Sequence, residues 1–168
     1  MAKYSILITG EVGRGKSRLL AALVDAVASL GVAVTVVDLA PERMGVGAKL
    51  RRYLREGVRY LTDDFRAPRL EAASPGEEAA LAEENAGRAA ALFRRYLEDP
   101  TPVLAVNDLT IYFHRGDPAL FWEVFHAARL FMASAYEGVS LRDRGSGITE
   151  RERRLLEEVK ALSHVVAL

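Results

Sequence analysis

The chain has 168 residues, of which 50% are hydrophobic and 27% charged, so it is long and apolar enough for one domain with a buried core and is not expected to be disordered. Basic and acidic residues number 23 each, and this balance argues against a nucleic-acid binder that relies on a strong positive charge. No cysteine is present, which excludes disulfide bonds, thiolate metal sites and a cysteine nucleophile.

Neither a membrane span nor a secretory signal is expected from the sequence. No apolar run approaches the roughly 18 residues that a membrane-spanning helix needs. Residues 1–8 include a lysine and lack both a long apolar stretch and a small-residue cleavage site. We therefore expect one cytoplasmic domain over residues 1–168.

The first 38 residues have the pattern of a strand, a helix and a second strand. Residues 4–9 form a short apolar run, and the glycine-bearing segment 10–15 follows it. From Lys16 to Leu30 the apolar residues recur at helical spacing, and Gly31 ends the pattern. Residues 32–37 are mostly β-branched, which is typical of a buried strand. This order predicts a right-handed βαβ unit.

The middle of the chain continues the alternation of helices and strands. The pattern predicts a helix near 48–55, a strand at 58–61, a loop over 65–74, a long helix over 75–97 and a strand at 103–106. In the last third, residues 118–136 fit either one helix or a short helix followed by a strand at 130–133. Thr149 and Glu152 match a capping box that opens a helix to Leu162, and residues 165–168 fit a final strand.

These alternating elements predict an α/β fold with three layers and a mostly parallel sheet. Seven aromatic side chains fall between Tyr112 and Tyr136, and most of them lie on the main helical face, which is expected to be core. Carboxyl ends of parallel strands share one edge of the sheet. Loops that follow the strands are therefore where a ligand is expected.

One motif of known chemistry lies between the first strand and the first helix. The segment Gly10-Glu11-Val12-Gly13-Arg14-Gly15-Lys16-Ser17 matches the pattern G-x-x-x-x-G-K-[ST] of phosphate-binding loops. Its glycines allow successive backbone N–H groups to face phosphate oxygens, and the helix that follows adds its positive dipole end. Lys16 would neutralise the β- and γ-phosphates, and the Ser17 hydroxyl would bind Mg²⁺. With Arg18, these residues form the predicted nucleotide-binding segment.

A second element of such a site follows the strand at 103–106. Asn107 and Asp108 stand at its carboxyl end, where Asp108 is expected to hold Mg²⁺ directly or through water. The next residue is Leu109 and not a glutamate that would orient an attacking water, which predicts slow hydrolysis. The chain contains neither Asn-Lys-x-Asp nor Thr-Lys-x-Asp, the guanine-recognition motif of many GTPases, so ATP is the expected nucleotide.

From Tyr4 to Asp108 the chain resembles the P-loop NTPase superfamily, which implies a three-layer P-loop fold and ATP with Mg²⁺ as ligands. The stretch from Val34 to Pro41 is similar to the second strand of the MinD/ParA-like ATPases, and this likeness implies a catalytic role for Asp38 near the metal and the attacking water. That group carries a lysine early in its loop where this chain has Glu11, so an intersubunit lysine mechanism does not carry over. The opening also resembles RecA-like cobalamin adenosyltransferases.

Three further segments are weaker candidates, each with a structural alternative. Asp63 and Asp64 follow a strand and would contact a substrate hydroxyl or the metal, or else stabilise a turn. Arg115 would reach a phosphate, while Asp117 in the same loop fits a cap for the next helix. Residues 142–147 would supply an arginine to the phosphates or form an ordinary surface loop.

Three functions remain open at this point. The first is a slow ATPase that acts as a nucleotide switch, with Lys16 and Asp38 as catalytic residues and Ser17 and Asp108 around the metal. The second is an ATP-dependent transferase, either a small-molecule kinase or an adenosyltransferase. The third is a module that holds the nucleotide without turnover. The expected partners are a nucleoside triphosphate and either a protein partner or a second copy of the chain, with nucleic acid unlikely.

Overall fold

A computed structural model describes residues 3–168 and contains one six-stranded, wholly parallel sheet. The strands are β1 (Tyr4–Gly10), β2 (Val34–Asp38), β3 (Arg59–Thr62), β4 (Val103–Asn107), β5 (Leu130–Tyr136) and β6 (His164–Ala167). They are arranged in the order β3-β2-β4-β5-β1-β6. Because β5 lies between β1 and β4, the strand before the glycine-rich loop does not pair with the strand that ends at Asn107.

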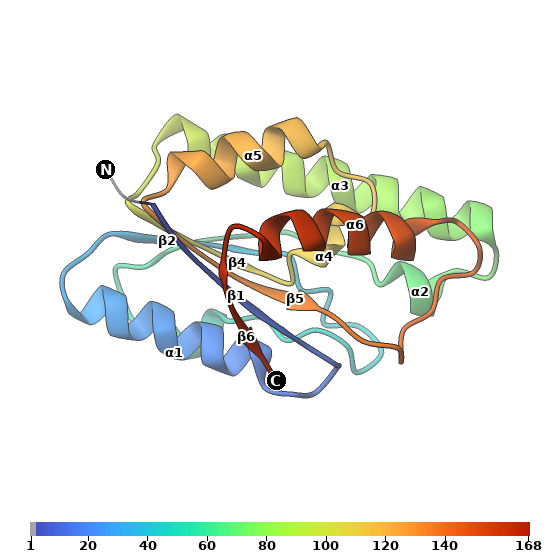
Figure 1. Ribbon diagram of the computed structural model, residues 1–168, viewed down its shortest axis with the longest axis horizontal. Coiled ribbons are helices and arrows are strands. Elements are labelled where there is room, and N and C mark those ends of the chain that lie inside the picture. Colours follow the sequence, from blue (N-terminus) through green and yellow to red (C-terminus); the bar gives the residue numbers. More distant parts are fainter. Residues whose placement is uncertain (1–2) are drawn as a thin grey trace.

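Helices cover both faces of the sheet, which makes the fold three-layered (Figure 1). The α-helices are α1 (Lys16–Ser29), α2 (Pro68–Glu71), α3 (Pro75–Glu98), α4 (Thr110–Phe113), α5 (Pro118–Ala127) and α6 (Ile148–Lys160), and a 3₁₀ turn spans Arg51–Tyr53. Helix α1 lies on one face, while α3, α5 and α6 lie on the other (Figure 1). The α/β fold with three layers that the sequence predicts is confirmed.

The strands supply side chains to two hydrophobic clusters, one on each face. In β4, Val103 and Ala105 pack in the cluster beneath α1, whereas Leu104 and Val106 belong to the cluster on the opposite face. Successive side chains of a strand point to opposite faces, so a strand covered on both sides is apolar throughout. This is the physical reason why the strand segments appear as continuous apolar runs in the sequence.

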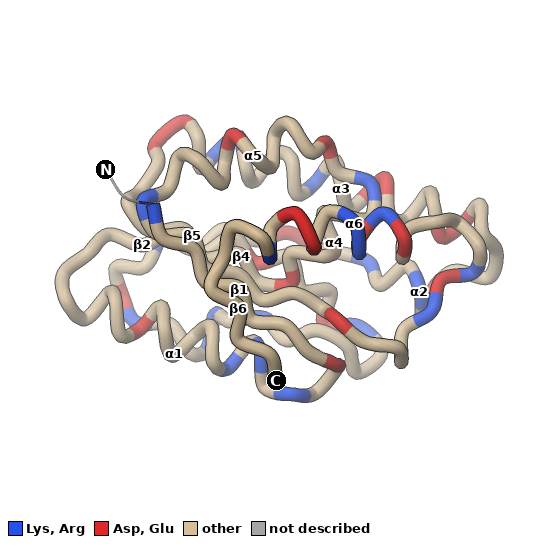
Figure 2. Tube along the Cα trace, viewed as in Figure 1, with Lys and Arg blue, Asp and Glu red and all other residues tan. Residues whose placement is uncertain are grey.

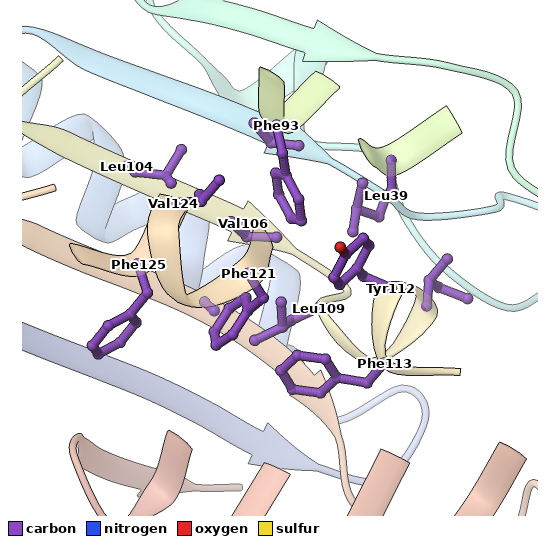
Figure 3. Close-up of a cluster of buried hydrophobic side chains, with 14 of the residues drawn as sticks. Leu39, Phe93, Leu104, Val106, Leu109, Tyr112, Phe113, Phe121, Val124 and Phe125 are labelled. Atoms are coloured by element: carbon purple, nitrogen blue, oxygen red, sulfur yellow. The ribbon is translucent and has the colours of Figure 1, made fainter. Parts of the chain in front are cut away.

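The larger cluster is rich in aromatic side chains (Figure 3). Phe121 of α5 is 1% exposed and lies edge-on to Phe113, with a distance of 5.0 Å between ring centroids. It also contacts Phe131 of β5 at 5.9 Å and Trp122 at 4.9 Å. Edge-to-face packing of this kind joins α4, α5 and the sheet. The expected placement of these aromatics in the core is confirmed.

The structure corrects the sequence analysis in several segments. Residues 118–136 are not one helix. The alternative of a short helix followed by a strand is confirmed, because α5 ends at Ala127 and β5 runs from Leu130 to Tyr136. The helix predicted at 48–55 is reduced to the 3₁₀ turn, since the chain there contacts the ends of the strands instead of continuing a regular helix. The loop predicted at 65–74 contains α2, which begins at Pro68.

The capping box predicted at Thr149 is also wrong. Helix α6 begins at Ile148 after Gly147, which has a φ of +84° and provides no side-chain cap. The Asp143 carboxylate accepts the backbone N–H of Thr149 at 3.1 Å instead. Glu152 does not return to the helix end, because its carboxylate is 3% exposed and paired with side chains from other elements.

Charged residues of both signs are interspersed on the helices, whereas the sheet carries few of them (Figure 2). This distribution agrees with the neutral total charge. Within residues 3–168, no helix combines the length and apolar character needed to cross a bilayer.

We expect Phe121→Ala to lower the free energy of unfolding by about 3–5 kcal/mol, because the substitution leaves a cavity among packed rings. Urea denaturation measures this change. The control is Leu30→Ala at an 80% exposed position, which should change stability by no more than about 0.5 kcal/mol. Equal effects of the two substitutions would contradict the packing described here.

Candidate functional site

The glycine-rich loop has the backbone that an anion-binding loop requires. Gly13 and Gly15 have φ angles of +76° and +84°, a region that residues with a Cβ atom rarely adopt. Helix α1 begins directly after Gly15, and no side chain caps its N-terminus. The first-turn N–H groups are therefore left for a ligand, and the positive end of the helix dipole adds to the attraction for an anion.

The glycine-rich loop borders a cavity, and Lys16 lies in the wall of this cavity. Its ammonium group donates a hydrogen bond to the backbone carbonyl of Glu11 within the loop. Burial lowers the pKa of Lys16, and the negative charge of Asp108 acts in the opposite direction. A partly desolvated ammonium held by a single carbonyl is well prepared to exchange that contact for phosphate oxygens.

Ser17 connects the loop to the ends of the strands. Its hydroxyl donates to Oδ1 of Asn107 at 3.0 Å. The same Asn107 oxygen accepts the Ser134 hydroxyl at 2.7 Å, while Nδ2 donates to Asp38 at 2.9 Å and to the carbonyl of Ala48 at 2.9 Å. All four hydrogen-bonding positions of the amide are thus used, which fixes its orientation.

This geometry fits a bound cation at Ser17. Because the Ser17 hydrogen is directed to Asn107, the lone pairs of its oxygen remain available for a hard metal ion. Sequence reasoning missed Asn107, although it stands directly before Asp108 at the end of β4. The only signal was a polar residue at the carboxyl end of a buried strand, a place shared by many residues without a functional role.

Asp38, at the end of β2, is fully buried and does not line the cavity. One oxygen accepts from Ala40 N at 3.1 Å and from Asn107, and the other accepts from Leu50 N at 2.6 Å and Tyr60 Oη at 2.7 Å. Four donors already occupy the carboxylate. Its contacts are those of a positioning residue that holds Asn107 and the segment around Leu50, and the orientation of a nucleophile by Asp38 stays a prediction.

Asp108 does line the cavity, close to Lys16. Its φ of +59° is unusual for a residue other than glycine, although Asp and Asn tolerate it better than other residues do. The backbone is held there by Ser134, which accepts Asp108 N at 2.9 Å through its hydroxyl and Leu109 N at 2.8 Å through its carbonyl. Burial raises the pKa of Asp108 to about 6, against the opposing effect of Lys16.

Glu11 has a different environment from the other loop residues. Its carboxylate accepts the hydroxyl of Ser140 at 2.7 Å and the backbone N–H groups of Val139 and Ser140, so it turns toward the chain after β5. These hydrogen bonds, that of the Ser140 hydroxyl first, lower the pKa of Glu11 to about 2. A Cβ atom at Gly138 would collide with the Glu11 carboxylate, so a side chain there would displace this carboxylate from its present position.

These elements surround one cavity of about 400 Å³, a size suited to a small-molecule ligand. The glycine-rich loop forms one wall, and residues 45–48 and Tyr53 form another. The cavity continues past Asp108 to Arg69 of α2 and to His114, which follows α4. The sequence analysis assigns no role to Arg69 or to His114. Nothing in the local pattern places Arg69 and His114 near the loop, because only the tertiary fold joins them.

The weaker candidates lie outside this cavity. Asp64 forms an exposed ion pair with Arg43 at 2.6 Å, and Asp63 accepts the backbone N–H of Asp64. Arg115 is exposed, whereas the Asp117 side chain accepts Ala119 N at 2.9 Å and caps α5. The structural alternative for Asp117 is therefore confirmed. Of residues 142–147, Arg144 and Ser146 contact the buried Glu78.

Comparison with known proteins supports the fold. No protein-family model and no curated protein matches the sequence. The crystal structure of flagellar accessory protein FlaH from Methanocaldococcus jannaschii is similar, with a TM-score of 0.55 and 11% identity over 98% of this chain and 70% of FlaH. FtsY from Mycoplasma mycoides has a TM-score of 0.45 and 13% identity over 98% of this chain but only 42% of FtsY. The chain thus has a P-loop NTPase-like fold, as its sequence predicts.

We expect Asp108→Asn to stabilise the ligand-free protein at pH 8 but not at pH 4. Folding raises the pKa of Asp108 to about 6, so ionising this carboxyl costs more in the folded state than in the unfolded state. Below about pH 4 the carboxyl is protonated in both states and this cost is absent. As the pH rises from there through about 6, the cost lowers the free energy of unfolding. Removing the ionisable group should therefore add on the order of 2–3 kcal/mol at pH 8 relative to pH 4.

Urea unfolding of both proteins at the two pH values, without nucleotide or Mg²⁺, measures this difference. Asparagine keeps the shape of aspartate and tolerates the left-handed backbone at this position. A change in stability that is the same at pH 4 and pH 8 would show that Asp108 ionises normally.

Proposed function

We propose that the protein binds a nucleoside triphosphate together with Mg²⁺, with ATP preferred, and acts as a slow ATPase or nucleotide-dependent switch. The observation that carries this proposal is the N-terminus of α1, which has no side-chain cap and follows a loop whose glycines have positive φ angles. Lys16 and Ser17, the first residues of this helix, line the cavity. Backbone N–H groups, an ammonium and a hydroxyl are the donor set that polyphosphate and magnesium require.

In this proposal each residue has a separate task. The loop amides and Lys16 bind the phosphates, and Ser17 and Asp108 hold the metal. A bound Mg²⁺ supplies neutralisation of phosphate charge at such a site. Asp38 and Asn107 act as positioning residues that keep the Ser17 oxygen directed toward the cavity. Positioning and charge stabilisation are sufficient for this class of reaction, which needs no covalent intermediate.

Slow turnover is expected from the residues around Asp108. Leu109 is fully buried in the core and provides no carboxylate for orienting a water molecule. Asp38, which was assigned this task by resemblance, has both oxygens occupied by donors. Without a free base at the phosphates, hydrolysis would depend on a partner or a second ligand.

A second candidate function is transfer of a group from ATP to an acceptor. The specific observation in its favour is the extension of the cavity beyond the glycine-rich loop to Arg69 and His114. The candidates are distinguished by incubating the protein with ATP and Mg²⁺ and measuring released phosphate, modified small molecules and remaining ATP. Phosphate release that rises with a protein partner supports the switch, and a modified small molecule supports the transferase. Retention of ATP without any turnover would contradict both and indicate a binding module.

We expect Lys16→Ala to weaken ATP·Mg²⁺ binding by more than tenfold, because it removes the one ammonium that the loop presents to the cavity. Isothermal titration measures the affinity. The matched control is Lys160→Ala, whose ammonium pairs with Glu137 and Glu157 and does not line the cavity, so this substitution should leave affinity unchanged. An unchanged affinity in Lys16→Ala would remove this residue from the site.

A further inference from the structure

Residues 11–15 of the glycine-rich loop are attached to the rest of the fold through one side chain. Among residues 3–168, the hydrogen bonds that join this part of the loop to a distant segment are those of the Glu11 carboxylate. The backbone carbonyls of Glu11 and Gly15 accept from Lys16 and Leu19, which are local contacts with the start of α1. Glycine backbones change conformation easily, so the shape of the loop depends on the contact of Glu11.

Val139 and Ser140 provide a set of donors that matches a carboxylate. Glu11 Oε1 accepts the backbone N–H groups of both residues, that of Ser140 at 3.0 Å, and Oε2 accepts the Ser140 hydroxyl at 2.7 Å. The N–H of Val12 also donates to Oε2, at 3.3 Å. Both oxygens are thus occupied, and hydrogen bonds to an ionised group are stronger than those between neutral groups. The carboxylate is therefore held in one orientation.

The segment that supplies these donors is itself fixed on either side of them. Glu137 N donates to Gly10 O at 3.0 Å, which continues the contact between β1 and β5. Leu141 N donates to Tyr136 Oη at 2.9 Å, and both of these residues line the cavity. Glu11 is therefore bound to an anchored segment and not to a free loop.

The charge of Glu11 opposes the ligand for which the loop is suited. Gly13 and Gly15 have positive φ angles, and Lys16 adds a positive charge, so the loop as a whole attracts an anion. A carboxylate beside such a site repels phosphate, and its charge alone would weaken binding. Its contacts have the opposite effect, because a loop that is already ordered loses less conformational entropy when a ligand binds.

We propose that Glu11 is a positioning residue whose contact with Val139 and Ser140 holds the glycine-rich loop in its anion-binding shape before a ligand arrives. This inference rests on the proposed function, in which the loop binds phosphates. Both oxygens of Glu11 are occupied by other donors, so the residue acts through the loop and not by touching the ligand. Without this contact only molecules with an ordered loop can bind, and the apparent affinity falls with their fraction.

The test measures how fast the fluorescent nucleotide N-methylanthraniloyl-ADP, with Mg²⁺, binds to and leaves the 168-residue chain in stopped-flow experiments. Glu11→Gln keeps the size of the side chain and removes its charge. Loss of repulsion alone would speed association of an anion, whereas loss of the contact slows it. We expect association to slow roughly tenfold and dissociation to stay within about twofold of that of the unaltered protein.

Two substitutions at Ser140 form a matched pair. Ser140→Ala removes the hydroxyl that donates to Glu11, and Ser140→Thr keeps a hydroxyl at this position. We expect Ser140→Ala to slow association about threefold or more, and Ser140→Thr to bind as fast as the unaltered protein. The control for loss of a carboxylate is Glu157→Gln, whose side chain pairs with Lys160 and does not line the cavity. This variant should leave both rates unchanged.

The order of the loop is measured directly in the ligand-free protein by ¹⁵N relaxation of Gly13 and Gly15. Order parameters near roughly 0.85 indicate a rigid backbone, and values below about 0.6 indicate a flexible one. In Glu11→Gln these values should fall from the first range to the second. They should rise again when inorganic triphosphate binds with Mg²⁺, because the ligand then orders the loop.

The outcomes separate this inference from the proposed function. Association that is unchanged or faster in Glu11→Gln overturns the inference, and so does a loss of affinity in the dissociation rate, which indicates direct contact with the ligand. If the unaltered protein binds neither the labelled ADP nor inorganic triphosphate, the proposed function fails, and the order parameters alone decide whether Glu11 orders the loop. If Glu11→Gln does not fold, the pair of substitutions at Ser140 decides.

Discussion

The amide of Asn107 is the contact on which the geometry of the site depends. Its oxygen accepts hydrogen bonds from the hydroxyls of Ser17 and Ser134, and its nitrogen donates hydrogen bonds to Asp38 and to the carbonyl of Ala48. One buried side chain thereby ties the start of α1 to the ends of β2, β4 and β5. Because every hydrogen-bonding position is used, no smaller or differently shaped side chain can replace it without leaving a buried polar group unpaired.

This arrangement explains why Asp38 is buried with four donors. The parallel register places Asp38 directly opposite Asn107 on the neighbouring strand. A carboxylate that accepts from Asn107, Ala40, Leu50 and Tyr60 also holds the chain after β2 against the sheet. The resemblance to MinD/ParA-like ATPases suggested a reacting group at this position, while the contacts describe a support for one.

The sequence was most informative where structure is local. Strand, loop and helix over residues 4–30 follow from apolar periodicity and glycine placement, and the phosphate-binding motif lies between them as its mechanism requires. The segment 118–136 was ambiguous, because a short apolar run suits a buried strand as well as a helix, and only pairing with β1 and β4 decides it. Arg69, His114 and Glu152 could not be grouped in advance, since they are joined only by packing of α2, α4 and α6.

The two ends of the cavity differ in how their charges are balanced. At the glycine-rich loop, neither Lys16 nor Asp108 forms an ion pair within residues 3–168, and burial disfavours the charged form of each. At the other end, Arg69 and Glu152 already neutralise each other. One region is therefore suited to a highly charged ligand, and the other to an uncharged one.

The hydrogen bonds of Glu11 have a consequence for communication across the molecule. They attach the glycine-rich loop to Val139 and Ser140, which lie on the segment between β5 and α6. A change in the position of Glu11 would therefore break or move its hydrogen bonds with Val139 and Ser140. A positively charged side chain at this position would be repelled by the same N–H groups, so the link and a lysine of the MinD/ParA type are mutually exclusive. Glu11 therefore joins two loops at the surface of the same chain.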